Sequence, residues 1–501
     1  NMLQRMFNEI NVSTSFIFLT VFLAFFYWYR RPKNFPPGPR GVPFLGFYRF
    51  FGNHPASKMR TWSKKYGPVM SVRMGRQDWV VLGDYETIQQ GLVKQGNEFS
   101  GRPSIDIIER VSKGNGMIFL NYDEHWKKQR RFGLSTLRGF GVGKRSMEDR
   151  ITEEVAYLND AIRTHDGKAF NIQSILGNAI SNNICSIVMG RRFDYDDERF
   201  KEIITRLARR YLTLRPAVCL RVHFGQFPIL FTHLWRVDER CTRHIKKLIP
   251  ESLREMVEEH KASYEQDNHR DFIDAFLGEQ KAENGAKTFT AKYNNFYCIM
   301  YVIIFVAGTE TTTSTLRWSL LCLIHDPEIQ DKLRKEIFEV LGQEKIPAFE
   351  DKSKMPYTRA FIQEIYRHRT LLPLSVTHMT NEDANICGYT IQKGTTIAPN
   401  LWAVHNDPVV WDEPNKFKPE RHLDADGNFV QLKHVIPFSV GPRHCLGEQL
   451  ARMEVFIFLV SLVQKFEFLP DPKAKVLSDN ENGSSGAAFV PLPFKIVAKV
   501  V

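Results

Sequence analysis

The chain has 501 residues and carries 68 Lys and Arg against 56 Asp and Glu, which gives a formal net charge of +12. Hydrophobic residues make up 43% and charged residues 25%. These ordinary fractions exclude a disordered, collagen-like or multi-span membrane chain. Seven cysteines are too few for a disulfide scaffold of this size. The positive balance fits nucleic acid, a membrane surface or an acidic partner, and composition does not choose among them.

An uncharged stretch, residues 10–29, stands near the N-terminus. As a helix it would reach about 30 Å, the thickness of one hydrocarbon core. Its last three residues are aromatic, and Arg30, Arg31 and Lys33 follow. We therefore predict that residues 1–33 form a transmembrane anchor with stop-transfer charges, and that the chain beyond it is cytosolic. A cleaved signal peptide is the alternative, but bulky aromatic residues stand where its small cleavage motif would lie.

Residues 34–46 contain Pro-Pro-Gly-Pro at 36–39 and are predicted to form a stiff hinge, because proline fixes φ and disfavours helix before it. Residues 47–501 are predicted to form one large, mainly helical domain with small sheets. Strand patterns occur at 71–82, 386–391 and 396–399, and helical patterns at 85–95, 148–164, 200–214, 239–266, 291–325 and 328–341.

Two further stretches of the body are distinctive in composition. Residues 218–234 are apolar and aromatic, and they form either a helix packed on the core or a channel lip that dips into the membrane. Residues 478–486 are rich in polar residues and glycine, which predicts an exposed loop.

One cysteine lies in the pattern F-x-x-G-x-R-x-C-x-G, residues 438–447. A thiolate that binds haem iron needs hydrogen-bond donors and positive charge nearby. A helical pattern at 446–463 begins just after Cys445, and backbone N–H groups at its start would supply such donors. Most single cysteines are simply buried, and that interpretation fits the other six in this chain.

The remaining fixed positions of the pattern each have a physical use. Gly441 permits a tight turn and Gly447 a close approach, since glycine has no Cβ. Arg443 could pair with a haem propionate. Phe438 could cover the sulfur and limit water. The pattern therefore predicts a haem-thiolate loop.

The chain resembles the cytochrome P-450 superfamily of haem-thiolate monooxygenases, and most of all the animal microsomal family 2 enzymes. The resemblance spans essentially the whole chain and rests on the cysteine pattern and on residues 36–39, 99–103, 126–144, 192–195, 400–405 and 447–451. It implies the P-450 fold and haem b with the Cys445 thiolate as axial ligand. It also implies dioxygen, and NADPH electrons delivered by a flavoprotein reductase, with cytochrome b5 as an optional second donor. Two positions depart from the pattern: His422 replaces the usual Phe, and Thr377 replaces a frequent Pro.

Residues 307–312 place a glycine and several threonines inside a predicted long helix. A threonine can bond the carbonyl one turn back and distort the helix. By itself the run fits an ordinary buried helix with a solvated Glu. The resemblance implies that Thr311 is the distal threonine and Glu310 its acidic neighbour, and that they deliver protons to oxygen.

Glu364 and Arg367 are three residues apart and would be neighbours on a helix, which usually means a solvated pair. The resemblance implies that they join Arg421 in a buried network behind the haem. Loss of one member would leave an uncompensated charge and prevent haem incorporation.

Trp126 and Arg130 are four apart, on one helix face. The resemblance implies that they contact the haem propionates together with Arg102, His378 and Arg443. It also implies a substrate pocket, in which Ala307 contacts both haem and substrate, formed by Phe119, Ile303, Ala307, Leu372, Val376 and Phe489.

Basic residues gather around the predicted helix at 126–130 and before the cysteine loop. They would steer an acidic reductase toward that face. Nucleic acid is not expected, since no recognised binding motif accompanies the charge. These basic residues are Lys127, Lys128, Arg130, Arg131, Arg138, Lys144, Arg145 and Lys433.

The sequence therefore predicts a haem monooxygenase of the endoplasmic reticulum membrane, with a lumenal N-terminus and a cytosolic catalytic domain. It would hydroxylate or epoxidise an apolar small molecule, and fatty acids, steroids or sterols and foreign compounds all remain open. One alternative is a haem-thiolate isomerase or dehydratase that needs no reductase. The other is a haem-free, membrane-anchored binding protein.

Overall fold

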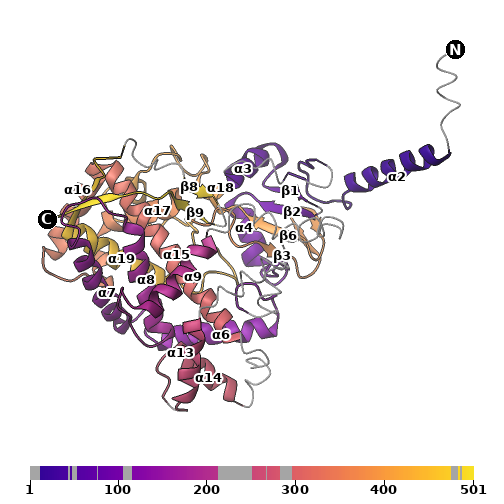
Figure 1. The fold of residues 1–501 in the computed structure, drawn as a ribbon. Coiled ribbons are helices and arrows are strands. Elements are labelled where there is room, and N and C mark those ends of the chain that lie inside the picture. The colour runs from indigo at the N-terminus through magenta and orange to yellow at the C-terminus, as the bar shows by residue number, and fades with distance from the viewer. Residues whose placement is uncertain are drawn as a thin grey trace.

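The computed structural model describes residues 12–42, 46–47, 54–75, 77–104, 116–212, 251–266, 268–282, 296–474, 483–485 and 488–501. Figure 1 shows a larger helical region and a smaller region of strands beside α3 and α4. The described α-helices are α2 (Val12–Tyr29), α3 (Pro55–Tyr66), α4 (Tyr85–Ile88), α6 (Glu124–Gly139), α7 (Arg145–Arg163), α8 (Ile172–Val188), α9 (Glu198–Leu212), α13 (Glu251–Ala262), α14 (Phe272–Lys281), α15 (Phe296–His325), α16 (Pro327–Leu341), α17 (Pro356–His368), α18 (Leu401–His405) and α19 (Glu448–Lys465).

The main sheet has the order β1-β2-β6-β3. Strands β1 (Val69–Met74) and β2 (Gln77–Leu82) form an antiparallel hairpin, and β6 (Thr396–Pro399) runs parallel to β2. Strand β3 (His378–Met379) pairs antiparallel with β6. Three two-stranded sheets pair β4 (Ala384–Ile386) with β5 (Tyr389–Ile391), β7 (Phe466–Pro470) with β10 (Ile496–Val500), and β8 (Gly483–Ser485) with β9 (Phe489–Pro491).

Most predicted elements are found, with shifted boundaries. The strand pattern at 386–391 is a hairpin instead, because Cys387 and Gly388 adopt φ of 49° and 81° and turn the chain. Within the helical pattern predicted at 239–266, the described helix α13 begins at Glu251 and ends at Ala262. Residues 213–250, with the apolar stretch at 218–234, lie outside the described residues. Of the predicted loop at 478–486, residues 483–485 form β8 and the others are not described.

Helix α15 passes through the helical region and packs against α8 and α19. Its C-terminal half is buried on all sides, as the fully enclosed Trp318 and Leu323 show. Helix α19 is likewise enclosed from Val455 to Val463. Helices that are apolar all round belong in a core, so the sequence itself assigns both to the interior. Helix α15 contains the predicted oxygen-activation segment, and α19 follows the cysteine loop. The fold therefore brings these two parts of the predicted site together.

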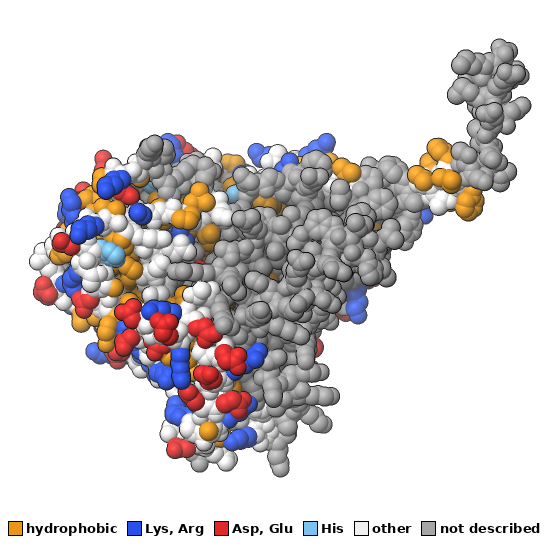
Figure 2. All heavy atoms as spheres, viewed as in Figure 1, with side chains coloured by type: hydrophobic (Ala, Val, Ile, Leu, Met, Phe, Trp, Pro, Cys, Tyr) orange, Lys and Arg blue, Asp and Glu red, His pale blue; other side chains and the backbone are white. Residues whose placement is uncertain are grey.

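Helix α2 leads away from the body in Figure 1, and several of its apolar side chains, including Phe16, Phe18 and Phe22, are exposed (Figure 2). Among the described residues, none of the helices is long and apolar enough to cross a membrane. The anchor over residues 1–33 therefore stays a prediction. Arg31 contacts the body, because its guanidinium donates to the Gly38 carbonyl at 2.9 Å and lies 3.5 Å from Asp78.

Candidate active site

The cysteine loop is a tight turn that leads into α19. The backbone N–H of Cys445 donates to the carbonyl oxygen of Phe438 at 3.0 Å. Gly441 has a φ of 79°, and a Cβ there would lie 1.9 Å from the Leu92 carbonyl oxygen. The predicted need for glycine at 441 is therefore explained. At Gly447 no described protein atom lies within 4 Å of the Cβ position, so the close approach predicted there is not to the protein.

The Cys445 side chain is exposed to open space, yet protein surrounds the sulfur closely enough to weaken its solvation. Burial raises the pKa of this thiol, and the nearby Glu448 carboxylate raises it further. The backbone N–H of Gly447 and the Arg130 guanidinium lower the pKa of the thiol, but by less than burial and Glu448 raise it. The predicted donors are present, but they do not offset the effect of burial on the pKa of the thiol. An iron ion would supply the missing positive charge.

A cavity lies between α15, α17 and α19, bounded by Thr311 on one side and Phe438 of the cysteine loop on another. The Phe438 ring packs edge-on against Tyr366 with centroids 5.4 Å apart. The remaining lining residues are Thr312, Thr315, Ile365, Tyr366, Arg369, Leu371, Pro437, Ala451 and Val455.

Thr311 and Glu310 lie in an unbroken part of α15. The Thr311 hydroxyl donates to the Ala307 carbonyl at 2.6 Å, which is the predicted bond one turn back. Thr315 makes the same bond to Thr311 at 2.9 Å. Burial raises the pKa of Glu310 to about 7, against the attraction of Arg317. Glu310 can therefore both hold and release a proton near neutral pH.

Three predicted propionate ligands, Arg102, Arg130 and Arg443, lie close enough to influence one another. Burial and the charges of Arg102 and Arg130 lower the pKa of Arg443 to about 8. Burial and Arg130 lower that of Arg102 to about 9. Their N–H groups bond backbone carbonyl oxygens, namely those of Ser100, Met117, Ile118, Leu120, Val376, Thr377 and His444.

In the described part of the chain, no carboxylate lies within ion-pair distance of these three guanidinium groups. Buried charges without a counterion are costly, so the cluster requires an anionic partner. The two propionates of haem fit this requirement, because carboxylate bonds to guanidinium are stronger than the carbonyl bonds they would replace. The residues present therefore fit a bound haem.

Two predicted donors of the same cluster are already engaged. The Trp126 indole N–H donates to the Met117 carbonyl at 3.0 Å, and the Arg443 guanidinium lies 4.1 Å from the indole centroid. His378 is bonded through Nδ1 to the Phe99 carbonyl at 2.8 Å, and burial holds its pKa well below the usual value. Its Nε2 becomes a donor only in the imidazolium form, which a propionate beside it would favour.

Of the six predicted substrate-pocket residues, none of the five whose side chains are described lines this cavity. Leu371, the residue before Leu372, lines the cavity. Its carbonyl accepts the backbone N–H of Phe489 at 2.7 Å. The Phe489 ring is buried and stacks on Trp318 at 5.2 Å. Phe119, Leu372 and Val376 are half-buried, Ala307 is exposed on α15, and the side chain of Ile303 lies outside the described residues.

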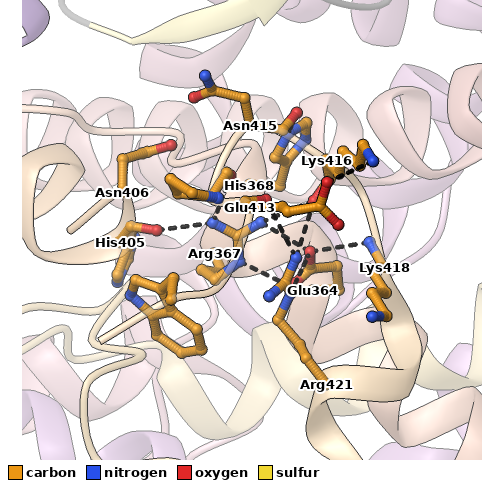
Figure 3. Close-up of polar contacts among 12 residues, drawn as sticks. Glu364, Arg367, His368, His405, Asn406, Glu413, Asn415, Lys416, Lys418 and Arg421 are labelled. Atoms are coloured by element: carbon orange, nitrogen blue, oxygen red, sulfur yellow. Dashed lines mark hydrogen bonds and ion pairs between the residues drawn. The ribbon is translucent and has the colours of Figure 1, made fainter. Parts of the chain in front are cut away.

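The predicted network behind the cavity is fully formed (Figure 3). Arg367 donates to both oxygens of Glu364 at 2.7 Å, and Arg421 reaches Glu364 at 3.1 Å. Arg367 also bonds the carbonyls of His405 and Pro414, so the pair ties α17 to the chain after α18. Neither Glu364 nor Arg367 has measurable exposure.

Two residues to which the sequence assigned no role contribute to these sites. His422, where the resemblance expected Phe, bonds Glu364 through Nε2 at 2.9 Å and becomes a fourth network member. Glu454 on α19 accepts from Thr312 at 3.2 Å and from Asn183 at 3.3 Å, and burial raises its pKa to about 8. A lone acid inside an apolar helix was the available signal.

The exposed face of α6 is basic and adjoins the cysteine loop. Lys127, Lys128 and Arg131 are exposed there, while Arg130 turns inward and bonds the His444 carbonyl. The other predicted basic residues that are exposed nearby are Arg138, Lys144, Arg145 and Lys433.

Comparison with known proteins extends the argument from the site to the whole chain. The cytochrome P450 family model matches residues 36–498. Cytochrome P450 2U1 of Bos taurus is 36% identical over 96% of this chain and 92% of its own length. Cytochrome P450 2J2 of Homo sapiens is 38% identical over 89% and 88%, and cytochrome P450 2C5 of Oryctolagus cuniculus is 40% identical over 91% and 92%. With a cysteine loop, a cation cluster and a single helical body that all fit haem, the chain belongs to the cytochrome P450 family of haem-thiolate monooxygenases.

Proposed function

We propose that this protein hydroxylates or epoxidises an apolar small molecule, with electrons that pass from NADPH through a flavoprotein reductase. The cavity bounded by Thr311 and by Phe438 carries the proposal, because it lies between the predicted oxygen-activation segment and the loop that contains the proposed iron ligand. Haem, when bound there, supplies the dioxygen chemistry and accepts the electrons. Fatty acids, steroids or sterols and foreign compounds are the substrate classes to be tested.

Each group of site residues has a proposed task. Cys445 provides the axial sulfur, and Phe438 shields it from water. Arg102, Arg130 and Arg443 hold the propionates, with Trp126 and His378 beside them. Ala307 and Gly447 leave room for the haem, and Thr311 and Glu310 hold protons for delivery to dioxygen. The substrate pocket remains proposed at Phe119, Ile303, Ala307, Leu372, Val376 and Phe489.

The proposed location is the endoplasmic reticulum membrane, with residues 1–33 as anchor, 34–46 as hinge and 47–501 as catalytic domain. The exposed basic face of α6 beside the cysteine loop supports docking of an acidic reductase there. Cytochrome b5 and membrane lipid are further proposed partners.

The function is tested with the purified full chain, reductase, NADPH and a panel of fatty acids, steroids and foreign compounds. We expect an oxygenated product that requires both NADPH and reductase. Turnover of an organic peroxide to an isomer or dehydrated product, with no need for reductase, would instead support the isomerase or dehydratase alternative.

Thr311→Ala is expected to raise peroxide release relative to product and to lower product formation by about 10²-fold, because a proton-transfer group is lost. The measurement compares NADPH consumed, peroxide released and product formed. Thr315→Ala is the matched control, since Thr315 lines the same cavity and makes the same bond one turn further on. Equal coupling in the two variants would remove the proposed role of Thr311.

Removal of residues 1–29 is expected to reduce membrane association and to leave haem binding intact. Removal of 1–33 also deletes Arg31 and its contacts with Gly38 and Asp78, so it should additionally lower thermal stability. Both truncations are assayed by membrane fractionation, haem content and melting temperature. Full membrane association after either truncation would contradict the anchor.

A further inference from the structure

One charged side chain on the cavity wall has no assigned task. Arg369 follows α17, is only 5% exposed, and lines the cavity together with Thr311 and Phe438. Its guanidinium lies 4.9 Å from the centroid of the Trp318 ring, and its Nε has no hydrogen-bond partner. The remaining polar contact is with the thiol of Cys322.

Arg369 has no counterion in the described part of the chain. Glu364, on the preceding helix α17, is already bonded to Arg367, Arg421 and His422. Neither Trp318 nor Cys322 carries a compensating negative charge. A buried cation of this kind is costly for folding, and its field is weakly screened because solvent and salt ions are excluded.

A fixed positive charge beside a redox centre stabilises the state that holds one more electron. Burial and nearby charge are among the features by which proteins set haem potentials. We propose that Arg369 raises the reduction potential of the haem and so favours acceptance of the first electron. This inference rests on the proposed function, because it requires haem in the cavity between Thr311 and Phe438.

Arg369 is a positioning residue, since it acts through its charge and is not one of the predicted propionate ligands. Its effect therefore separates from that of Arg102, Arg130 and Arg443, whose charges would be neutralised by the propionates. Charge, rather than shape, is the property to vary in a test.

Spectroelectrochemical titration of the full-length holoenzyme gives the test. Arg369→Gln should lower the midpoint potential relative to wild type, and Arg369→Lys should keep it near the wild-type value. The difference should persist at high ionic strength, because a buried charge is little screened. Arg369→Met, which keeps the apolar stem against Trp318, is the second neutral variant if the glutamine variant loses haem.

Arg334→Gln is the matched control, because it removes a largely buried guanidinium from α16, outside the cavity lining. Neutral variants with normal haem content and a wild-type potential would overturn the inference, as would an equal shift in the control. The reduced CO complex of the wild type is recorded first. A wild type without the red-shifted band overturns the proposed function and this inference together, whereas a normal band with an unmoved potential overturns only the inference.

Discussion

Glu364→Ala is expected to lower the free energy of unfolding by about 3–5 kcal/mol and to abolish stable haem incorporation. In the wild type, Arg367 donates two hydrogen bonds of 2.7 Å to Glu364. The substitution removes both bonds and leaves the fully buried Arg367 guanidinium without a carboxylate partner. It also removes the acceptor for Arg421 and His422. Because whole domains are stable by only about 5–15 kcal/mol, such a loss is a large fraction of the total.

Haem content per chain and chemical denaturation measure this effect. Glu339→Ala is the matched control, because Glu339 is an exposed helical carboxylate that lies 4.0 Å from Lys335 and should matter little. A Glu364→Ala protein with normal haem content and the stability of the control would show that the network is not structural.

The same carboxylate predicts a pH dependence. Burial alone would raise the pKa of Glu364, but hydrogen bonds from Arg367 and His422 outweigh it and lower the pKa from 4.5 to about 2. A depressed folded-state pKa means that the carboxylate stabilises the fold above its unfolded pKa and loses this contribution as the pH falls through about 2. The difference in free energy of unfolding between wild type and Glu364→Gln should therefore become smaller as the pH falls from 4.5 to about 2.

Local signals in the sequence were sufficient to predict most of the helices and strands. His325-Asp326-Pro327 predicts a helix boundary, and Asp326 indeed caps α16 by accepting the backbone N–H of Ile329 at 3.3 Å. The bond from Thr311 to the Ala307 carbonyl was predictable because it joins residues one turn apart on one helix. Short-range geometry of this kind can be derived from residue order alone.

Contacts between distant segments could not be predicted in this way. Glu454 meets Asn183 only because α19 and α8 pack together, and the sequence shows merely an acid in an apolar run. The indole N–H of Trp126 donates to the Met117 carbonyl, an acceptor that the sequence does not indicate, and its contact with a propionate stays a prediction. The choice between two acceptors depends on how a loop folds back, which no periodicity encodes.

Cys445→Ala is expected to abolish the red-shifted band of the reduced CO complex, because the methyl group cannot bind iron. In the wild type, burial and Glu448 raise the pKa of the thiol, so an iron ion bound at Cys445 would be expected to displace the thiol proton. Haem loading of the wild type should consequently release a proton, which a weakly buffered titration detects. The alanine variant should release none.

Cys387→Ala is the matched control, because the thiol of Cys387 is likewise free and exposed. It lies in the β4–β5 hairpin and is bonded only weakly to Gln90 at 3.5 Å. Its removal should change neither the CO spectrum nor the proton release. A retained red-shifted band in Cys445→Ala would assign the iron ligand to another residue, and the roles given to Phe438 and Gly447 would fall with it.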